Sequence, residues 1–169
     1  IIGGIISIAT GNLIFLIFPL IARALGIFAT FVGMPFVRLS EKEAKHPMKA
    51  LRKGLMVTTI VAGILFFIAT IFLLGNMYLF YCLLAGLAAS VAIDYITDYY
   101  TGRDRSPVVK IAKASETGSA TNIITGFAVG LETTALPIVS LAIALIASYW
   151  FGTQFGAEIG IDPFIGGIY

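Results

Sequence analysis

Residues 115–137 read SETGSATNIITGFAVGLETTALP, and this stretch decides how the whole chain is interpreted. It has the length of a membrane-spanning helix, since about 20 residues of α-helix cross about 30 Å of hydrocarbon. It also carries hydroxyls, an amide, glycines and one carboxylate, Glu132. Polar groups at membrane depth usually face a protein interior or a pathway. The stretch therefore predicts a spanning helix whose polar residues find partners inside the protein.

The composition of the chain is that of a membrane protein. Of its 169 residues, 59% are hydrophobic and 12% are charged, and the mean hydropathy is +0.98. A soluble domain is roughly 45–50% apolar and 25% charged. We therefore expect an all-α membrane protein in which residues 1–169 form one transmembrane region. Four stretches have the length and apolar character of spans, at about 13–37, 50–74, 77–99 and 118–151.

The first residues give no sign of a signal peptide. The chain opens on Ile1, without a charged n-region or a small-residue cleavage site, and this favours an internal piece of a longer protein. Its single cysteine, Cys82, excludes a disulfide within the chain.

The basic residues predict the orientation in the membrane. Of eleven Lys and Arg residues, all but Arg23 lie in or beside two connections, 38–49 and 100–117. Lys and Arg collect in the cytoplasmic loops of membrane proteins. We therefore expect both connections to be cytoplasmic and both ends of the chain to lie on the outer side. Nucleic-acid binding is disfavoured, since the chain lacks a soluble domain and aromatic residues interleaved with the basic ones.

Two full charges fall inside the spans, Arg23 and Glu132. Arg23 precedes Arg38 by roughly 22 Å of helix, and Glu132 follows Gly118 by roughly 21 Å. Because these depths match, we expect the two side chains to pair, directly or through water. Two alternatives remain open, an ion pathway that includes Glu132 and a contact with an unrelated group.

The fourth span carries small and polar residues at every fourth position. This spacing places them on one stripe, where small residues allow close helix packing and polar groups bond across the contact. Ser115 or Thr117 is expected to cap the N-terminus of this helix. Pro137 is expected to kink it, with Thr133 or Thr134 bonding the freed carbonyl. The stripe consists of Gly118, Asn122, Gly126, Gly130 and Thr134.

Catalytic motifs are otherwise missing from the sequence. It has no phosphate-binding loop, no nucleophile with a histidine base and no histidine-based metal set. Asp94 and Asp98 share a helix face and could join a Mg²⁺ site. The commoner case is a solvated pairing of such helix-end acids with Arg103 and Arg105.

Residues 96–137 read ITDYYTGRDRSPVVKIAKASETGSATNIITGFAVGLETTALP. This segment resembles membrane-bound, ion-translocating inorganic pyrophosphatases, and the segments FPLIARALGIFATFVGMPFVR and GGIY resemble that family more loosely. The matching positions are Asp98, Tyr99, Tyr100, Thr101, Pro107, Ile111, Ala112, Ala114 to Gly118, Ala120 to Ile124 and Gly126.

The resemblance implies a pump with roughly sixteen spanning helices in two rings, which forms a homodimer and hydrolyses Mg²⁺-pyrophosphate while moving H⁺ or Na⁺ outward. K⁺ is a possible further cofactor. The four spans here look like the seventh to tenth and would serve as scaffold and packing helices. The acidic segments that carry the family's chemistry are absent, so no catalytic or metal-binding residue is assigned. The alternative is part of a secondary transporter or channel, with Arg23 and Glu132 lining its pathway, and a structural membrane subunit is a third reading.

Overall fold

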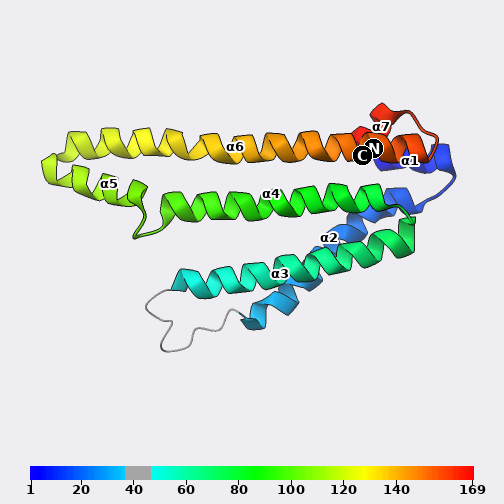
Figure 1. The fold of residues 1–169 in the computed structure, drawn as a ribbon, viewed down its shortest axis with the longest axis horizontal. Helices are drawn as coiled ribbons and strands as arrows, with labels where there is room; N and C mark the ends of the chain where they lie inside the picture. Colours follow the sequence, from blue (N-terminus) through cyan, green and yellow to red (C-terminus); the bar gives the residue numbers. More distant parts are fainter. Residues whose placement is uncertain (37–46) are drawn as a thin grey trace. The chain divides into compact units, whose positions relative to one another are not determined.

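The protein is described here by a computed structural model that covers residues 1–36 and 47–169. Within these ranges every regular element is helical (Figure 1). In chain order the elements are α1 (Ile2–Thr10), α2 (Ile14–Gly33), the 3₁₀ turn η1 (Met34–Phe36), α3 (Pro47–Ala69), the π-helical turn η2 (Thr70–Leu74), α4 (Met77–Thr101), α5 (Ser106–Ala114), the 3₁₀ turn η3 (Ser115–Thr117), α6 (Ser119–Glu158) and α7 (Pro163–Ile168).

Four helical segments of the described ranges are long and apolar enough to cross a membrane, which confirms the predicted fold class. They are Ile14–Gly33, Arg52–Leu74, Met77–Thr117 and Ser119–Glu158. Three features were not expected from the sequence. The connection 100–117 contains α5 and η3, the chain begins with the short α1, and α7 follows the fourth span. Residues 38–46 of the first basic connection lie outside the described residues.

The connection between α3 and α4 is a tight hairpin. Gly75 adopts a left-handed conformation (φ 62°), which glycine reaches without steric penalty, and it ends η2. The side-chain oxygen of Asn76 then accepts a hydrogen bond of 2.9 Å from the backbone N–H of Tyr78 at the start of α4. Gly75 thus ends η2, and Asn76 stabilises the start of α4.

The chain divides into two compact units, and the first comprises Ile1–Leu87 and Ala147–Tyr169. Its core is a cluster of apolar side chains from α1, α2, α4 and α6. Phe15 contacts the ring of Phe155 at a centroid distance of 5.7 Å, and Phe155 stacks on Tyr169 at 6.0 Å. The buried members of the cluster are Ile6, Phe15, Leu79 and Phe155.

A close approach of α2 to α3 lies at Gly33 in the same unit. A Cβ atom on Gly33 would overlap the side chain of Thr58 and lie 3.3 Å from the carbonyl oxygen of Gly54. Thr58 is held in place because its hydroxyl donates a 2.9 Å hydrogen bond to that same carbonyl. Glycine at position 33 therefore permits this contact.

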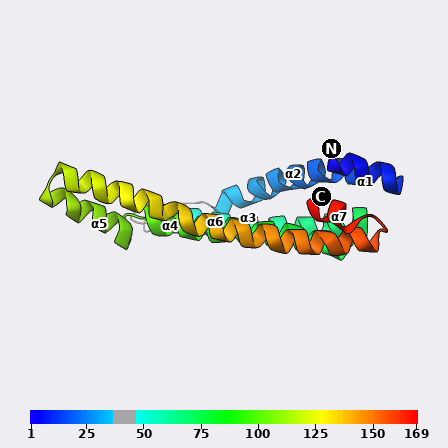
Figure 2. The ribbon, with the colours of Figure 1, turned by 90° about the horizontal axis from the view of Figure 1, so that it is seen from above.

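The second unit comprises Ala88–Ile146, which includes the end of α4, all of α5 and most of α6. Figures 1 and 2 both show α5 lying beside the first turns of α6. Among the best-buried residues of this unit are Pro107 of α5 and Val129 of α6. With 40 residues, α6 is about 60 Å long, roughly twice the thickness of the hydrocarbon layer.

Candidate functional site

Glu132, which was expected at membrane depth, is exposed within the second unit, and its hydrogen-bond partner there is Tyr100. The Tyr100 hydroxyl donates to Oε1 of Glu132 across 3.4 Å, a long and therefore weak hydrogen bond. Tyr100 is 8% exposed, and its ring packs edge-on against Tyr99. The carboxylate thus has a neutral partner, one that the sequence analysis did not propose.

This contact revises the depth assigned to Glu132. Tyr100 lies one residue before the end of α4, so Glu132 is level with the last turn of α4. The thirteen residues from Ser119 to Glu132 extend α6 by about 20 Å past that level. The predicted depth was measured from the start of α6. The start of α6 and the end of α4 lie at different levels, because α5 and η3 carry the chain beyond the end of α4 before α6 begins.

Arg23, the proposed partner of Glu132, lies near the middle of α2 and is exposed. Within the described residues of its own unit it forms no ion pair. Because Arg23 belongs to the first unit and Glu132 to the second, their pairing stays a prediction.

Ser115 and Thr117 bond to a different helix from the one they were expected to cap. The Ser115 hydroxyl donates to the carbonyl of Ala112, and the Thr117 hydroxyl donates to the carbonyl of Ala114 at 2.8 Å. Both acceptors belong to the last turn of α5, whose carbonyls have no partner within the helix. The two hydroxyls therefore bond to the end of α5, and the Thr117 hydroxyl also lies 2.8 Å from the Thr121 hydroxyl in the first turn of α6.

The stripe of small residues on α6 is only partly covered. Asn122 and Gly126 are half-buried, whereas Gly118, Gly130 and Thr134 are exposed. A Cβ atom on Gly126 or on Gly130 would have no neighbour within 4 Å among the described residues. The Asn122 side-chain oxygen is buried without a hydrogen-bond partner in the described part of the chain. The packing role of the stripe stays a prediction.

Pro137 lies inside α6, which continues through it to Glu158. The carbonyl that a proline deprives of its usual donor is the one four residues earlier, here that of Thr133. The Thr133 hydroxyl instead donates to Gly130 at 2.6 Å, and that of Thr134 donates to Leu131 at 2.8 Å. The expectation that either hydroxyl bonds the freed carbonyl is therefore wrong, because each hydroxyl bonds the carbonyl three residues before its own position.

Of the two acids at the end of α4, Asp98 forms a surface ion pair. Arg105 contacts Asp98 with an N–O distance of 3.1 Å, and its side chain is 48% exposed. In the described ranges no group of three or more His, Cys, Asp or Glu side chains could hold a metal ion. A contribution of Asp94 and Asp98 to a Mg²⁺ site therefore stays an untested alternative.

The sequence analysis missed a close contact between α6 and α7. A Cβ atom on Gly166 would lie 2.5 Å from the carbonyl oxygen of Gly152 and 2.6 Å from the Cα of Gly156. Figures 1 and 2 show α7 folded back beside the last turns of α6. The signal was present in the sequence, since Gly152 and Gly156 have the four-residue spacing of close helix contacts.

A second contact that the sequence analysis missed joins the α3–α4 hairpin to the end of α6. The side-chain amide of Asn76, which is 7% exposed, donates a short hydrogen bond to the carboxylate of Glu158. This hydrogen bond could not be predicted from local sequence patterns, because the two residues are 82 positions apart.

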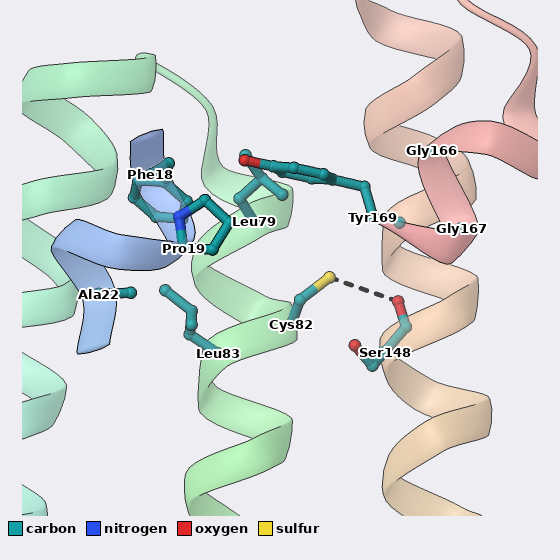
Figure 3. A pocket seen from close by; sticks show the side chains of 11 residues that line it. Phe18, Pro19, Ala22, Leu79, Cys82, Leu83, Ser148, Gly166, Gly167 and Tyr169 are labelled. Atoms are coloured by element: carbon teal, nitrogen blue, oxygen red, sulfur yellow. Dashed lines mark hydrogen bonds between the residues drawn. The ribbon is translucent and has the colours of Figure 1, made fainter. Parts of the chain in front are cut away.

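A cavity of about 210 Å³ lies in the first unit. Figure 3 shows Tyr169 reaching across it from α7, opposite Phe18 and Pro19 of α2. The Cys82 thiol points toward α6 and donates to the carbonyl of Ser148 at 3.3 Å. The lining is otherwise apolar or glycine, so the cavity offers no set of polar groups for catalysis. Its lining residues include Phe18, Pro19, Leu79, Cys82, Ser148 and Tyr169.

The chain is similar to known proteins over most of its length. Residues 1–164 match the family described as Inorganic H+ pyrophosphatase. Over 150 residues the chain is 43% identical to the K(+)-insensitive pyrophosphate-energized proton pump 2 of Moorella thermoacetica, covering 86% of this chain and 22% of that protein. Over 167 residues it is 37% identical to the Putative K(+)-stimulated pyrophosphate-energized sodium pump of Clostridium tetani, covering 95% and 24%.

A third relative is the Pyrophosphate-energized proton pump 2 of Mycoplana dimorpha, 36% identical over 162 residues, with 88% of this chain and 77% of that protein covered. The chain spans about a fifth of the length of the first relatives that it matches. No solved structure matches it. The match over residues 1–164 agrees with four apolar spans and with the motif at residues 96–137, and it shows that this chain belongs to the inorganic H⁺ pyrophosphatase family.

Proposed function

We propose that this chain is a segment of a membrane pyrophosphatase that couples pyrophosphate hydrolysis to outward transport of H⁺ or Na⁺. The observation that carries the proposal is the family match over residues 1–164 in a chain with four apolar spans. The relatives are named as pyrophosphate-energized proton or sodium pumps. For this reason the alternative of a secondary transporter with Arg23 and Glu132 lining its pathway is not favoured.

In this proposal the segment contributes scaffold and packing helices, and the chemistry resides elsewhere in the pump. Mg²⁺ would neutralise the diphosphate and orient it for attack by water, held by carboxylates outside residues 1–169. K⁺ is a possible further cofactor, since relatives are named both K(+)-insensitive and K(+)-stimulated.

The stripe on α6 is proposed to pack against the remaining helices of the pump or against the second subunit of a homodimer. Two observations support a partner for this part of α6. Gly126 and Gly130 have open space around them, and the Asn122 oxygen is buried without a partner in the described ranges. In addition, Ile123 and Phe127 are 70% and 69% exposed on turns that extend past α4, where water would be an unfavourable neighbour.

The basic connections are proposed to be cytoplasmic, with both ends of the chain on the outer side. Support comes from the exposed Lys110 and Lys113 of α5. Labelling of single cysteines in intact cells tests this orientation. A membrane-impermeant maleimide should label Ala157→Cys, which is exposed near the end of α6, and should label Lys110→Cys only after the cells are opened. The reverse pattern would contradict the proposal.

Inverted vesicles that contain the full-length protein test the activity. Pyrophosphate with Mg²⁺ should be hydrolysed and should drive H⁺ or Na⁺ into the vesicles, whereas pyrophosphate without Mg²⁺ should not. Measuring uptake with and without Na⁺ and K⁺ distinguishes the transported ion and the role of K⁺. Vesicles that hydrolyse no pyrophosphate in the presence of Mg²⁺ would rule the proposal out.

A further inference from the structure

Pro19 interrupts the hydrogen bonding of α2 without ending the helix. It is the sixth residue of α2, which continues to Gly33. Proline has no backbone N–H, so the carbonyl of Phe15, four residues earlier, loses its usual partner. Phe15 is only 6% exposed and belongs to the apolar core of the first unit. A carbonyl in this setting needs another donor.

The donor comes from the other end of the chain. The Tyr169 hydroxyl donates to the Phe15 carbonyl at 2.8 Å, across 154 positions of sequence. This is a hydrogen bond of ordinary length and is made to the acceptor that Pro19 leaves open. Figure 3 shows the hydroxyl end of Tyr169 directed toward the part of α2 that carries Phe18 and Pro19.

Several contacts hold Tyr169 in this position. Asp162 caps the N-terminus of α7, and its side chain accepts a 2.9 Å hydrogen bond from the backbone N–H of Phe164. Gly166 of α7 lies directly against Gly152 of α6. The Tyr169 ring also packs edge-on against Phe15 at a centroid distance of 6.2 Å. The position of the hydroxyl therefore follows from the packing of α7 on α6.

The hydroxyl also keeps its proton at every physiological pH. Burial raises the pKa of Tyr169 to about 12, because the phenolate would lose hydration. Tyr169 can thus act as a permanent donor to the carbonyl.

We propose that Tyr169 replaces the backbone donor that Pro19 removes from α2, so that α7 acts as a clasp across the proline break. With the clasp closed, the Phe15 carbonyl is paired and α2 runs through the break. With the clasp open, the Phe15 carbonyl has no partner and the break becomes a hinge. The inference concerns the conformation of α2 and does not depend on the proposed pump activity.

A double-mutant cycle in the full-length protein in lipid nanodiscs tests the clasp, with amide hydrogen exchange of residues 14–23 as the measurement. Tyr169→Phe keeps the ring and removes the donor, so exchange in this segment should become about five-fold faster. In a Pro19→Ala background, the N–H of the new alanine can pair with the Phe15 carbonyl. Tyr169→Phe should then leave the exchange unchanged.

The controls separate this hydrogen bond from the packing of the ring. Tyr81→Phe removes a hydroxyl that has no hydrogen-bond partner in the described part of the first unit, and it should not alter exchange of residues 14–23. Pro19→Leu also restores an N–H and serves if Pro19→Ala does not accumulate. Equal acceleration with and without Pro19 would overturn the proposal, since the hydroxyl would then act independently of the carbonyl that Pro19 leaves open. No acceleration in either background would overturn it as well, since another donor would then pair with the carbonyl.

Discussion

The glycines of the two units have opposite surroundings, although both sets lie on α6 at four-residue spacing. In the first unit Gly152 and Gly156 contact the backbone of α7 so closely that a Cβ atom on Gly166 would have no room. In the second unit Gly126 and Gly130 have nothing within 4 Å among the described residues. The same pattern therefore marks a made contact in one unit and an open face in the other, and spacing alone does not tell them apart.

The largest effect is expected for Gly166→Ala in the full-length protein. The new Cβ would lie 2.5 Å from the carbonyl oxygen of Gly152, and backbone atoms cannot move aside as a flexible side chain can. We expect a loss of about 3 kcal/mol in stability, at the upper end of the usual range for overpacking. Thermal unfolding in detergent, followed by fluorescence, measures it. An unchanged melting temperature would show that α7 does not pack on α6 in this way.

Gly126→Ala is the matched variant in the second unit. If the face stays open in the full-length protein, alanine should stabilise α6 by up to about 1 kcal/mol, because it favours the helix over glycine. If the stripe packs against other helices of the pump, the same change should destabilise the protein. The sign of the shift in melting temperature thus decides whether the glycine face of the second unit is still open in the complete pump.

An effect smaller than that of Gly166→Ala is expected for Gly33→Ala, which would place a methyl group where Thr58 lies. A side chain can adjust better than backbone, so we expect about 1–2 kcal/mol of destabilisation. Thr58→Ala should restore most of the loss in the double variant, since it removes the overlapping atoms. Thermal unfolding of the two single variants and the double variant tests this, and strictly additive losses would contradict the contact.

Asn76→Ala should lower stability by about 1–3 kcal/mol, because it removes the hydrogen bond between a buried amide and the charged Glu158 carboxylate. It also removes the acceptor for the N–H of Tyr78. Glu158→Gln is the milder control, since its amide oxygen can still accept from Asn76. Urea or thermal unfolding compares the two, and equal losses would argue against the hydrogen bond.

The smallest effect is expected for Tyr100→Phe. The hydrogen bond to Glu132 is 3.4 Å long, so its removal should lower stability by no more than about 0.5 kcal/mol. A double-mutant cycle with Glu132→Gln measures the coupling of the pair. A coupling well above that value would mean that Glu132 depends on Tyr100 more than the distance suggests.

The spans could be predicted from the sequence because hydrocarbon thickness imposes a minimum length of apolar helix. The hairpin at Gly75 also follows from the local sequence, because glycine adopts the left-handed backbone conformation without steric penalty. The partner of Glu132 was not predicted, because its depth was measured from the start of α6. The hydrophobic periodicity of the sequence does not show that α5 carries the chain beyond the end of α4 before α6 begins. It also does not show that Tyr100 then lies opposite Glu132.

What the sequence by itself determined is the membrane class, the four spans and the family, since these depend on composition, on segment length and on a contiguous motif at residues 96–137. Only the tertiary structure decided which polar and small residues meet. Asn76 meets Glu158, Tyr169 meets the Phe15 carbonyl at the Pro19 break, and Gly166 meets Gly152. The physical reason is that the type of a residue shows only that a polar side chain needs a hydrogen-bond partner or that a small side chain allows a close contact. Which group meets that need depends on how helices distant in sequence are brought together.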